Sequence, residues 1–373
     1  MAESHNMLPK GNITRAQASK TEVLMRDIIE QKSMNNKRLT REEILYLVTN
    51  LKNLEIREWI YKTADSVRKK YMTDTVFLRG IIEFSNICSK SCLYCGINSR
   101  IKNVERYRME KEEILETCFQ IKKNGQTTVV LQSGEDPYYT KEKMGEIIKA
   151  IKEQTELAVT LSVGERDEET YLYWKNCGMD RYLLRFETSN REIFKKLHPD
   201  GDFDNRINCL KVLKKIGVQT GSGFMIGLPG ADDNDLVNDI NQCRELDLDM
   251  IGVGPFIAHP ETELKEEFIK HEIDYITGVI AILRLTNPDS HIPATTAFDA
   301  VLEYQGRQLA LKRGANIFMP NSTPQKYRKS YQLYPGKPCV DESGDDCASC
   351  VVGRITSIGR TIGKGPGHSM KRG

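Results

Sequence analysis

Apolar and polar residues follow two different periods along this chain of 373 residues. From Thr40 to about Tyr71, apolar side chains recur at helical spacing, and Glu43 stands three residues after Thr40, as in a capping box. The pattern predicts a helical region over 21–75, preceded by a flexible polar leader at 1–20.

From residue 76 onward, short apolar runs rich in β-branched residues alternate with amphipathic stretches of helix length. The apolar runs lie at 78–84, 127–132, 158–162, 181–185, 221–227, 250–256, 291–296 and 315–319. The amphipathic stretches include 110–125, 141–154, 205–217 and 235–246. Runs without polar alternation are typical of strands covered on both faces. Eight of them with helix-length connections predict an α/β fold, a parallel (β/α)8 TIM-type barrel over 76–335.

Charge and hydropathy narrow the class of protein. The 54 basic side chains nearly balance 52 acidic ones, for a net charge of +2, which disfavours a dedicated nucleic-acid binder. No run approaches the ~20 apolar residues that span a bilayer, and the N-terminus lacks the apolar core of a secretory signal. We expect a cytoplasmic protein without a membrane partner. The extension at 336–373 ends in a basic stretch, expected to be a solvated tail, with weak RNA contact as the alternative.

Three of the ten cysteines follow the first predicted barrel strand, as C-x3-C-x2-C through Cys88, Cys92 and Cys95. Three thiolates in one loop can hold a soft metal, or three irons of a [4Fe-4S] cluster with the fourth iron open. Chance grouping, or a zinc site completed from elsewhere in the chain, is the alternative. Four scattered cysteines are expected to be small buried hydrophobes: Cys118, Cys177, Cys209 and Cys243.

Polar residues gather where the predicted strands end, the edge at which barrel enzymes place their chemistry. They are Glu83, Gln132, Thr160, Arg185, Glu187, Thr295 and Thr296. Arg181 and Arg185 stand four apart in one strand and so face the same side. Two buried charges favour an anionic partner, such as a ligand bearing carboxylate or cyanide. The alternative is internal ion pairing with Glu83, Glu135 or Glu187.

The cysteine spacing, with Tyr94 before and Gly96 after the last cysteine, resembles the signature of the radical S-adenosylmethionine (SAM) enzymes. Longer runs, SGEDPYY at 133–139 and YQLYPGKPC at 331–339, resemble the [FeFe]-hydrogenase maturases of the HydE type, relatives of biotin synthase and 3-methylornithine synthase. One departure is Phe186, where a polar histidine is expected.

The resemblance implies a [4Fe-4S] cluster on Cys88, Cys92 and Cys95, with SAM bound to its open iron. The positions that match cofactor-binding residues of the family are Tyr94, Gly96, Ser133, Gly134, Glu135, Thr160, Glu187, Arg206 and Met250. The resemblance also implies an auxiliary [2Fe-2S] cluster on Cys339, Cys347 and Cys350, with a zinc site as the alternative. A helix-surface ion pair for Arg206 and a core position for Met250 are the structural alternatives.

The residues that the resemblance assigns to substrate are Arg181, Arg185, Gln132, Thr295, Thr296, Met319, Tyr331 and Tyr334. The implied reaction begins with reductive cleavage of SAM to a 5′-deoxyadenosyl radical, which acts on an iron–cysteine complex bearing CO and cyanide. A partner radical SAM maturase, a GTPase scaffold and a low-potential electron donor are the implied partners. The rival functions are a lysine mutase or a biotin synthase-like enzyme, and a metal-binding module that does not cleave SAM.

Overall fold

The computed structural model describes residues 15–265, 272–302, 305–341 and 344–371, with side chains described throughout except at 15–20 and 344–349. Residues 1–14 of the predicted leader at 1–20 lie outside the described ranges. Its last six residues belong to helix α1 (Arg15–Met34), so the helical region begins earlier than expected.

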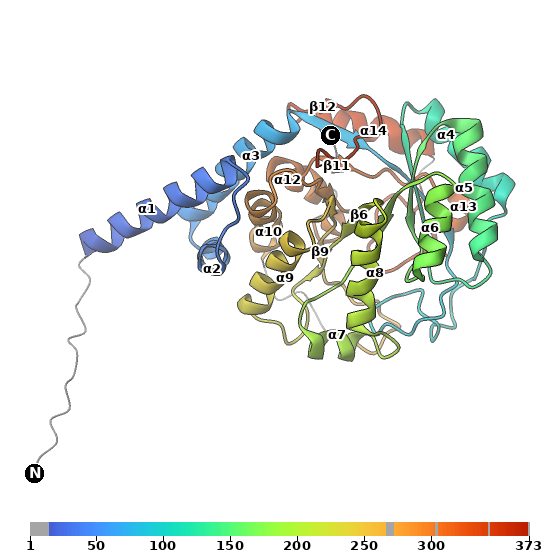
Figure 1. Cartoon of the computed structure of the whole chain (residues 1–373), viewed down its shortest axis with the longest axis horizontal. Coiled ribbons are helices and arrows are strands. Elements are labelled where there is room, and N and C mark those ends of the chain that lie inside the picture. Colours follow the sequence, from blue (N-terminus) through green and yellow to red (C-terminus); the bar gives the residue numbers. More distant parts are fainter. Residues whose placement is uncertain (1–14, 266–271, 303–304, 342–343, 372–373) are drawn as a thin grey trace, which may run out of the picture.

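The N-terminal helices form one unit at the side of the molecule, from which α1 projects (Figure 1). They comprise α1, α2 (Arg41–Thr49), the 3-10 turn η1 (Asn50–Lys52) and α3 (Leu54–Met72). The capping box of α2 is confirmed, since the Glu43 amide donates to Thr40 Oγ1 at 3.3 Å and the Thr40 amide donates to Glu43 Oε2 at 2.8 Å. The apolar faces of α2 and α3 pack on α9 (Asp233–Glu245) and α10 (Ile273–Thr286), which attaches the unit to the barrel.

The strands form a ring in which every recorded pair between named strands is parallel. The central strands are β2 (Gly80–Ser85), β3 (Thr128–Ser133), β4 (Ala158–Ser162), β5 (Met179–Leu183), β6 (Gln219–Ser222) and β8 (Met250–Ile251), paired in that order. β7 (Met225–Ile226) and β9 (Gly254–Pro255) extend β6 and β8, while β10 (Pro293–Ala294) and β11 (Ile317–Phe318) lead back to β1 (Thr75–Leu78). A bridge between Met250 and His291 joins the two arcs. The predicted barrel is confirmed, with a strand at each of the eight apolar runs.

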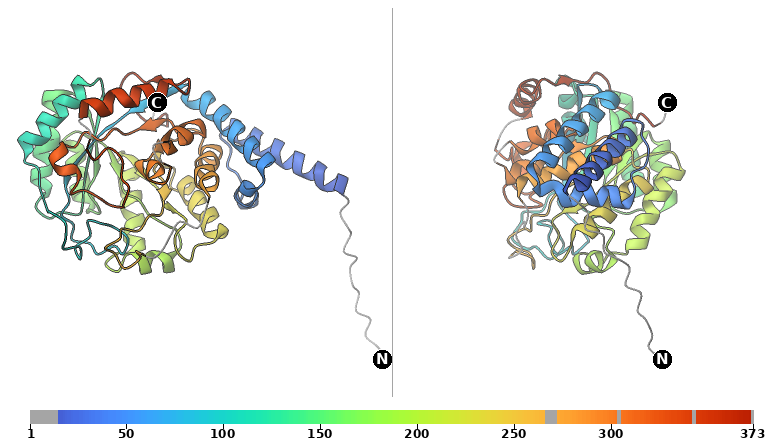
Figure 2. Two further views of the ribbon diagram at one scale, coloured as in Figure 1. Left: turned by 180° about the vertical axis from the view of Figure 1, so that it is seen from behind. Right: turned by 90° about the vertical axis from the view of Figure 1, so that its left-hand side faces the viewer.

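Helices surround the ring and cover its outer face (Figure 2). Those in the connections are α4 (Lys111–Lys123), α5 (Lys141–Thr155), α6 (Glu168–Asn176), α7 (Arg191–Leu197), α8 (Phe203–Lys215), α11 (Thr296–Val301), α12 (Gly306–Lys312), α13 (Gln325–Arg328) and, near the C-terminus, α14 (Gly344–Thr356). Buried strand residues such as Leu131 and Val159 pack with helix residues such as Ile148 in one continuous core. Among the described helices, none combines the length and apolar character that crossing a membrane requires.

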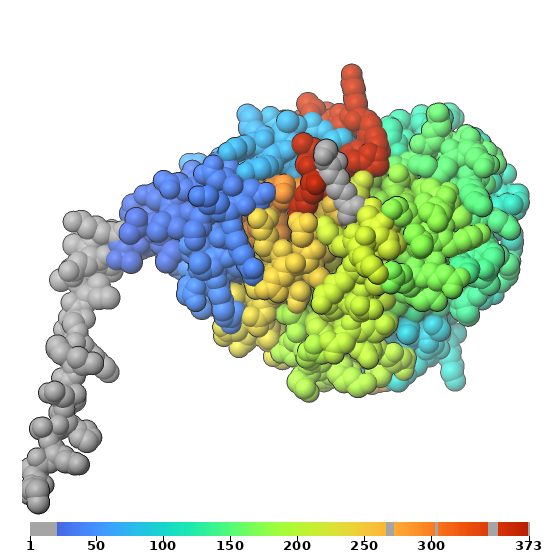
Figure 3. Space-filling view, viewed as in Figure 1, coloured from blue at the N-terminus to red at the C-terminus, as the bar shows by residue number. Residues whose placement is uncertain are grey.

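The basic C-terminal stretch, dark red in Figure 3, lies at the end of the barrel at which the strands begin, since Thr128 at the start of β3 donates to the Pro366 carbonyl at 3.2 Å. The carbonyl of Pro366 accepts from Arg181 Nη2 at 2.8 Å, and that of Gly367 accepts from Arg79 Nη2 at 3.1 Å. Just before them, β12 (Thr361–Ile362) pairs with β1. The expectation of a solvated tail is wrong, because two buried guanidinium groups take their hydrogen-bond acceptors from this segment.

Candidate active site

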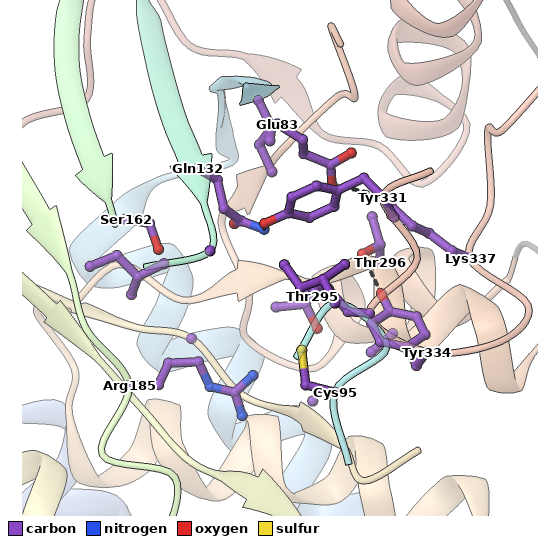
Figure 4. Close-up of a pocket in the computed structure, with 18 of the residues that line it drawn as sticks. Glu83, Cys95, Gln132, Ser162, Arg185, Thr295, Thr296, Tyr331, Tyr334 and Lys337 are labelled. Atoms are coloured by element: carbon purple, nitrogen blue, oxygen red, sulfur yellow. Dashed lines mark hydrogen bonds and ion pairs between the residues drawn. The ribbon is translucent and has the colours of Figure 1, made fainter. Parts of the chain in front are cut away.

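A cavity of about 360 Å³ opens where the barrel strands end (Figure 4). Seventeen of the predicted site residues line it: Cys88, Cys92, Tyr94, Cys95, Gln132, Ser133, Gly134, Glu135, Arg185, Glu187, Arg206, Thr295, Thr296, Met319, Tyr331, Tyr334 and Cys339. This volume is that of a pocket for a ligand of cofactor size. The carboxyl edge of the strands therefore brings together most of the residues selected from the sequence.

Three cysteines of the loop after β2 line one wall of this cavity. Cys88 Sγ accepts from the amides of Lys90 and Glu135, each at 3.4 Å. Burial raises the pKa of Cys88, burial and the neighbouring thiols raise that of Cys92, and burial raises the pKa of Cys95 to about 12. Buried thiols of this kind lose their protons when a metal supplies the compensating charge.

The donor set fits an iron–sulfur cluster with an open iron, because it offers three thiols and a free space in front of them. Among the described residues, no three Cys, His, Asp or Glu side chains converge as closely as a single ion requires. A [4Fe-4S] cluster takes one thiolate per iron, so its ligands are spread more widely than those of one ion.

Two glycines allow the cysteine loop to approach its neighbours. A Cβ on Gly134 would lie 2.3 Å from the carbonyl oxygen of Ile87, so β3 and the cysteine loop touch at this point. A Cβ on Gly96 would lie 2.1 Å from the carbonyl oxygen of Gln332, and the Gly96 amide donates to the Leu333 carbonyl at 2.9 Å. Gly96 is not among the lining residues, and it packs the loop against the 331–339 segment.

Charged groups line the cavity beside the thiols. Glu187 has a backbone φ of 68°, and its Oε2 lies 2.9 Å from Arg185 Nη2 without the geometry of a hydrogen bond. That buried oxygen lacks a hydrogen-bond donor among the described residues, so it fits a ligand hydroxyl. Arg206 bonds Glu165 and donates to the Arg185 carbonyl at 2.7 Å. Burial alone would lower the pKa of Arg206, but the Glu165 carboxylate raises it.

Hydroxyl groups line another part of the cavity, which we name the hydroxyl wall. Tyr334 and Thr296 share a hydrogen bond of 2.7 Å, and Gln132 Nε2 donates to the Tyr331 hydroxyl at 3.3 Å. Burial raises the pKa of Tyr334 to about 12 and that of Tyr331 well above its usual value, so both phenols remain protonated. Thr295 donates to the Val253 carbonyl at 2.9 Å. This wall therefore offers neutral donors and acceptors to a small ligand.

Sequence reasoning missed several lining residues, of which Lys337 has the clearest role. Its ammonium lies 2.5 Å from Glu83 Oε1, although Glu83 was expected to pair with an arginine if it paired at all. Lys337 stands within the YQLYPGKPC run, and that position is the only signal that could have drawn attention to it. Further lining residues are Ser162, His198, Arg307 and Asn321.

Three predicted site residues lie elsewhere. Thr160, Arg181 and Met250 line a separate cavity of about 10 Å³ near the start of the strands, beside Arg79. Arg181 lies within β5, whereas Arg185 lies two residues beyond its end. At about 3.3 Å per residue of extended chain, the two are separated by roughly 13 Å. The two arginines therefore cannot share one anionic ligand, and that expectation is wrong. For Arg185, the alternative of an internal ion pair is confirmed by Glu187.

The remaining predictions concern Phe186 and the second cysteine group. Phe186 is fully buried and its ring centroid lies 6.1 Å from that of Phe224, so its side chain packs in the core rather than at the cavity. Cys339 lines the cavity, Cys350 is exposed on α14, and the Cys347 side chain lies outside the described residues. The second cluster stays a prediction.

Comparison with known proteins places this site in a family. Residues 82–243 match the model of the radical SAM superfamily, a range that contains the cysteine loop. The chain is 47% identical to the [FeFe] hydrogenase maturase subunit HydE of Thermotoga maritima, over 91% of this chain and 96% of the relative. It is 31% identical to the 3-methylornithine synthase of Methanosarcina barkeri, over 89% of this chain and 93% of that protein.

Solved structures agree on the fold. Methylornithine synthase (PylB) superimposes with a TM-score of 0.79 at 29% identity, over 90% of this chain and 97% of that one. The hydrogenase maturase HydG superimposes with a TM-score of 0.78 at 17% identity, over 94% of this chain and 77% of that one, a likeness of fold alone. The site gathers thiols, acidic groups and basic groups at the strand ends, in agreement with these comparisons. The chain is a radical SAM enzyme and belongs to the family of the [FeFe]-hydrogenase maturase HydE.

Proposed function

We propose that the cavity holds a [4Fe-4S] cluster on Cys88, Cys92 and Cys95 with SAM beside it, and that the enzyme acts on a small iron complex in assembly of the diiron subsite of the hydrogenase H-cluster. The cluster, when bound, supplies the electron that cleaves SAM. The observation that carries the proposal is that the three thiols, Glu187 and Arg206 line the same cavity.

The residues next to the thiols suit the two polar ends of SAM. Glu187 Oε2 has no hydrogen-bond donor among the described residues and accepts hydrogen bonds from the ribose hydroxyls of SAM. Arg206 supplies a fixed cation for the methionyl carboxylate, since Glu165 and the Arg185 carbonyl hold its guanidinium in place. Ser133, Gly134 and Glu135 at the end of β3 bind the methionyl amine, with Glu135 as its counter-charge.

The hydroxyl wall, together with Arg185, suits a compact anionic substrate. Arg185, the ion-pair partner of Glu187, has a side chain that is 31% exposed and brings positive charge to the cavity. Gln132, Thr295, Thr296, Tyr331 and Tyr334 provide hydrogen bonds, while Met319 provides apolar contact. An iron–cysteine complex with CO and cyanide ligands combines a carboxylate, weak acceptors and an apolar surface, which this wall matches.

The remaining assignments rest on the family. The partners are a second radical SAM maturase that makes the iron complex, a GTPase scaffold that receives the product, and a low-potential electron donor. An auxiliary [2Fe-2S] cluster is assigned to Cys339, Cys347 and Cys350, and the protein is assigned to the cytoplasm.

A second candidate is a lysine mutase that makes 3-methylornithine. It is favoured by the 31% identity to the Methanosarcina barkeri enzyme over nearly its whole length. The two candidates share the SAM site and differ in the ligand that the hydroxyl wall binds.

The test is an anaerobic assay of the full chain reconstituted with iron and sulfide. Dithionite and SAM are added, and 5′-deoxyadenosine is quantified with the iron–cysteine dicarbonyl cyanide complex, with lysine, and with neither. A yield that rises with the iron complex, together with a new iron-centred EPR signal, supports the maturase. A yield that rises only with lysine supports the mutase. No cleavage by a fully loaded cluster contradicts both.

A further inference from the structure

The last residue of α7 and the three residues after it hold the cysteine loop. The Leu93 amide donates to the Leu197 carbonyl at 3.0 Å. The Ser91 amide and hydroxyl donate to one oxygen of Asp200 at 2.9 and 2.5 Å. The Tyr94 hydroxyl lies 3.0 Å from His198 Nε2. We name residues 197–200 the loop clamp.

The direction of the bond between Tyr94 and His198 follows from the second ring nitrogen. His198 Nδ1 lies 3.1 Å from the Phe194 carbonyl, which can only accept, so Nδ1 carries the proton. Nε2 of the neutral ring then accepts from the Tyr94 hydroxyl. The ring is fixed between Phe194, with a centroid distance of 4.4 Å, and Tyr94, with a centroid distance of 5.5 Å.

Asp200 provides the other half of the clamp. Its hydrogen bond from Ser91 lowers the pKa of Asp200, so the group is a carboxylate and its bonds are charge-assisted. Ser91 is 5% exposed, so without Asp200 its amide and hydroxyl would be left without these acceptors in a buried place.

The clamped residues bracket one thiol. Ser91 and Leu93 are the two neighbours of Cys92, and Tyr94 directly precedes Cys95. Fixing the backbone on both sides of Cys92 sets the direction of its side chain before any metal binds. A loop ordered in advance loses less conformational entropy on binding than a free one.

We propose that Asp200 and His198 are positioning residues that hold the cysteine loop in its cluster-binding conformation. The proposal rests on the proposed function, which assigns the loop's thiols to the cluster. Loss of the clamp loosens the loop in the metal-free protein and weakens retention of iron in the loaded protein, although neither residue is assigned as a ligand.

The test uses the full chain with Asp200→Ala, His198→Phe, Asp200→Asn and the control Asp204→Ala. The asparagine keeps an acceptor oxygen for Ser91. Asp204 is exposed and pairs with Arg191, away from the loop. Hydrogen exchange of the metal-free protein measures the amides of Ser91 and Leu93, which we expect to exchange about tenfold faster in Asp200→Ala and at nearly wild-type rates in Asp200→Asn and Asp204→Ala. His198→Phe is expected to speed exchange at Leu93 in particular.

In reconstituted protein, release of iron to a chelator is expected to be about tenfold faster in Asp200→Ala, and its EPR spectrum with SAM is expected to broaden at equal iron content. Wild-type exchange and iron release in both Asp200→Ala and His198→Phe would overturn the clamp. If the wild-type chain takes up no [4Fe-4S] cluster, the proposed function fails, while exchange in the metal-free protein still decides whether the clamp orders the loop.

Discussion

The Lys337 ammonium and the Glu83 carboxylate form an ion pair of 2.5 Å in which both side chains are 5% exposed. The two residues lie 254 positions apart in the sequence. Lys337 also donates to the Tyr331 carbonyl at 2.9 Å. The pair therefore fastens the 331–339 segment, which supplies one wall of the cavity, to the end of β2.

Lys337→Met is expected to lower the free energy of unfolding by about 3–5 kcal/mol, because it leaves the Glu83 carboxylate buried without its counter-charge. The double variant Lys337→Met/Glu83→Gln is expected to recover most of the loss. Urea unfolding of the metal-free chain measures both, with Lys326→Met as the control, since that lysine is 64% exposed. Equal stability of the single and double variants would contradict the assignment.

Arg185→Ala is expected to leave SAM cleavage in place and to abolish the increase of 5′-deoxyadenosine with substrate. The reason is that Arg185 is the cation we assign to the substrate. Coupled and uncoupled yields are compared with those of Arg191→Ala, a control on the surface of α7 whose side chain is 59% exposed. An unchanged coupled yield would remove Arg185 from the substrate site.

Cys92→Ala is expected to lose the cluster, with reconstituted iron falling to the background of the untreated chain. Two thiols do not suffice for a cluster that needs three protein ligands. Cys118→Ala is the matched control, because Cys118 is fully buried in α4 and away from the cavity. A SAM-perturbed EPR signal that persists in Cys92→Ala would refute the ligand assignment.

A stop codon at Pro366 is expected to lower the free energy of unfolding by about 3 kcal/mol, since Arg79 and Arg181 each lose a carbonyl acceptor while staying in the barrel. Iron uptake at the opposite end of the barrel is expected to remain. Thermal unfolding and iron content check the two halves of this prediction. A truncated chain as stable as the full one would mean that water replaces the tail at no cost.

His291 makes stability fall as the solution is acidified. Burial, and then the charge of Arg79, lower the pKa of His291 from 6.5 to about 3. Below pH 6.5, His291 is therefore protonated in the unfolded chain but stays neutral in the folded chain. The lost stability is about 1.4 kcal/mol per pH unit. Relative to His291→Gln, wild type is expected to lose about 2 kcal/mol between pH 7.5 and 5. Urea unfolding at both values checks this, and identical slopes would show that His291 titrates normally.

The sequence predicts the barrel because short apolar runs without alternation, such as 127–132, are typical of strands covered on both faces, and eight of them alternate with helix-length connections. It also predicts the cysteine loop, whose chemistry is local in the chain. It does not show that Arg181 and Arg185 lie at different positions along the barrel axis. The alternation of side chains along a strand indicates which face a residue lies on, but not which end of the barrel it lies near. The pairing of Lys337 with Glu83, and of the basic tail with Arg79, depends on contacts between distant segments that no local pattern encodes.

The pairing of β1 with β11, which closes the ring of strands, also affects how this protein folds. Nearby, the Glu83 amide donates to Thr323 Oγ1 across 240 residues of chain. Closing a loop of that length costs about 5 kcal/mol of chain entropy before any contact offsets it, and long-range parallel pairing slows folding. The cysteine loop directly follows β2, so its cavity is complete only when this ring has closed. Before the strand ring closes, the three cysteine thiols of a newly made chain are not yet surrounded by the rest of the cavity. We therefore expect the cluster to bind after ring closure, the slow step of folding.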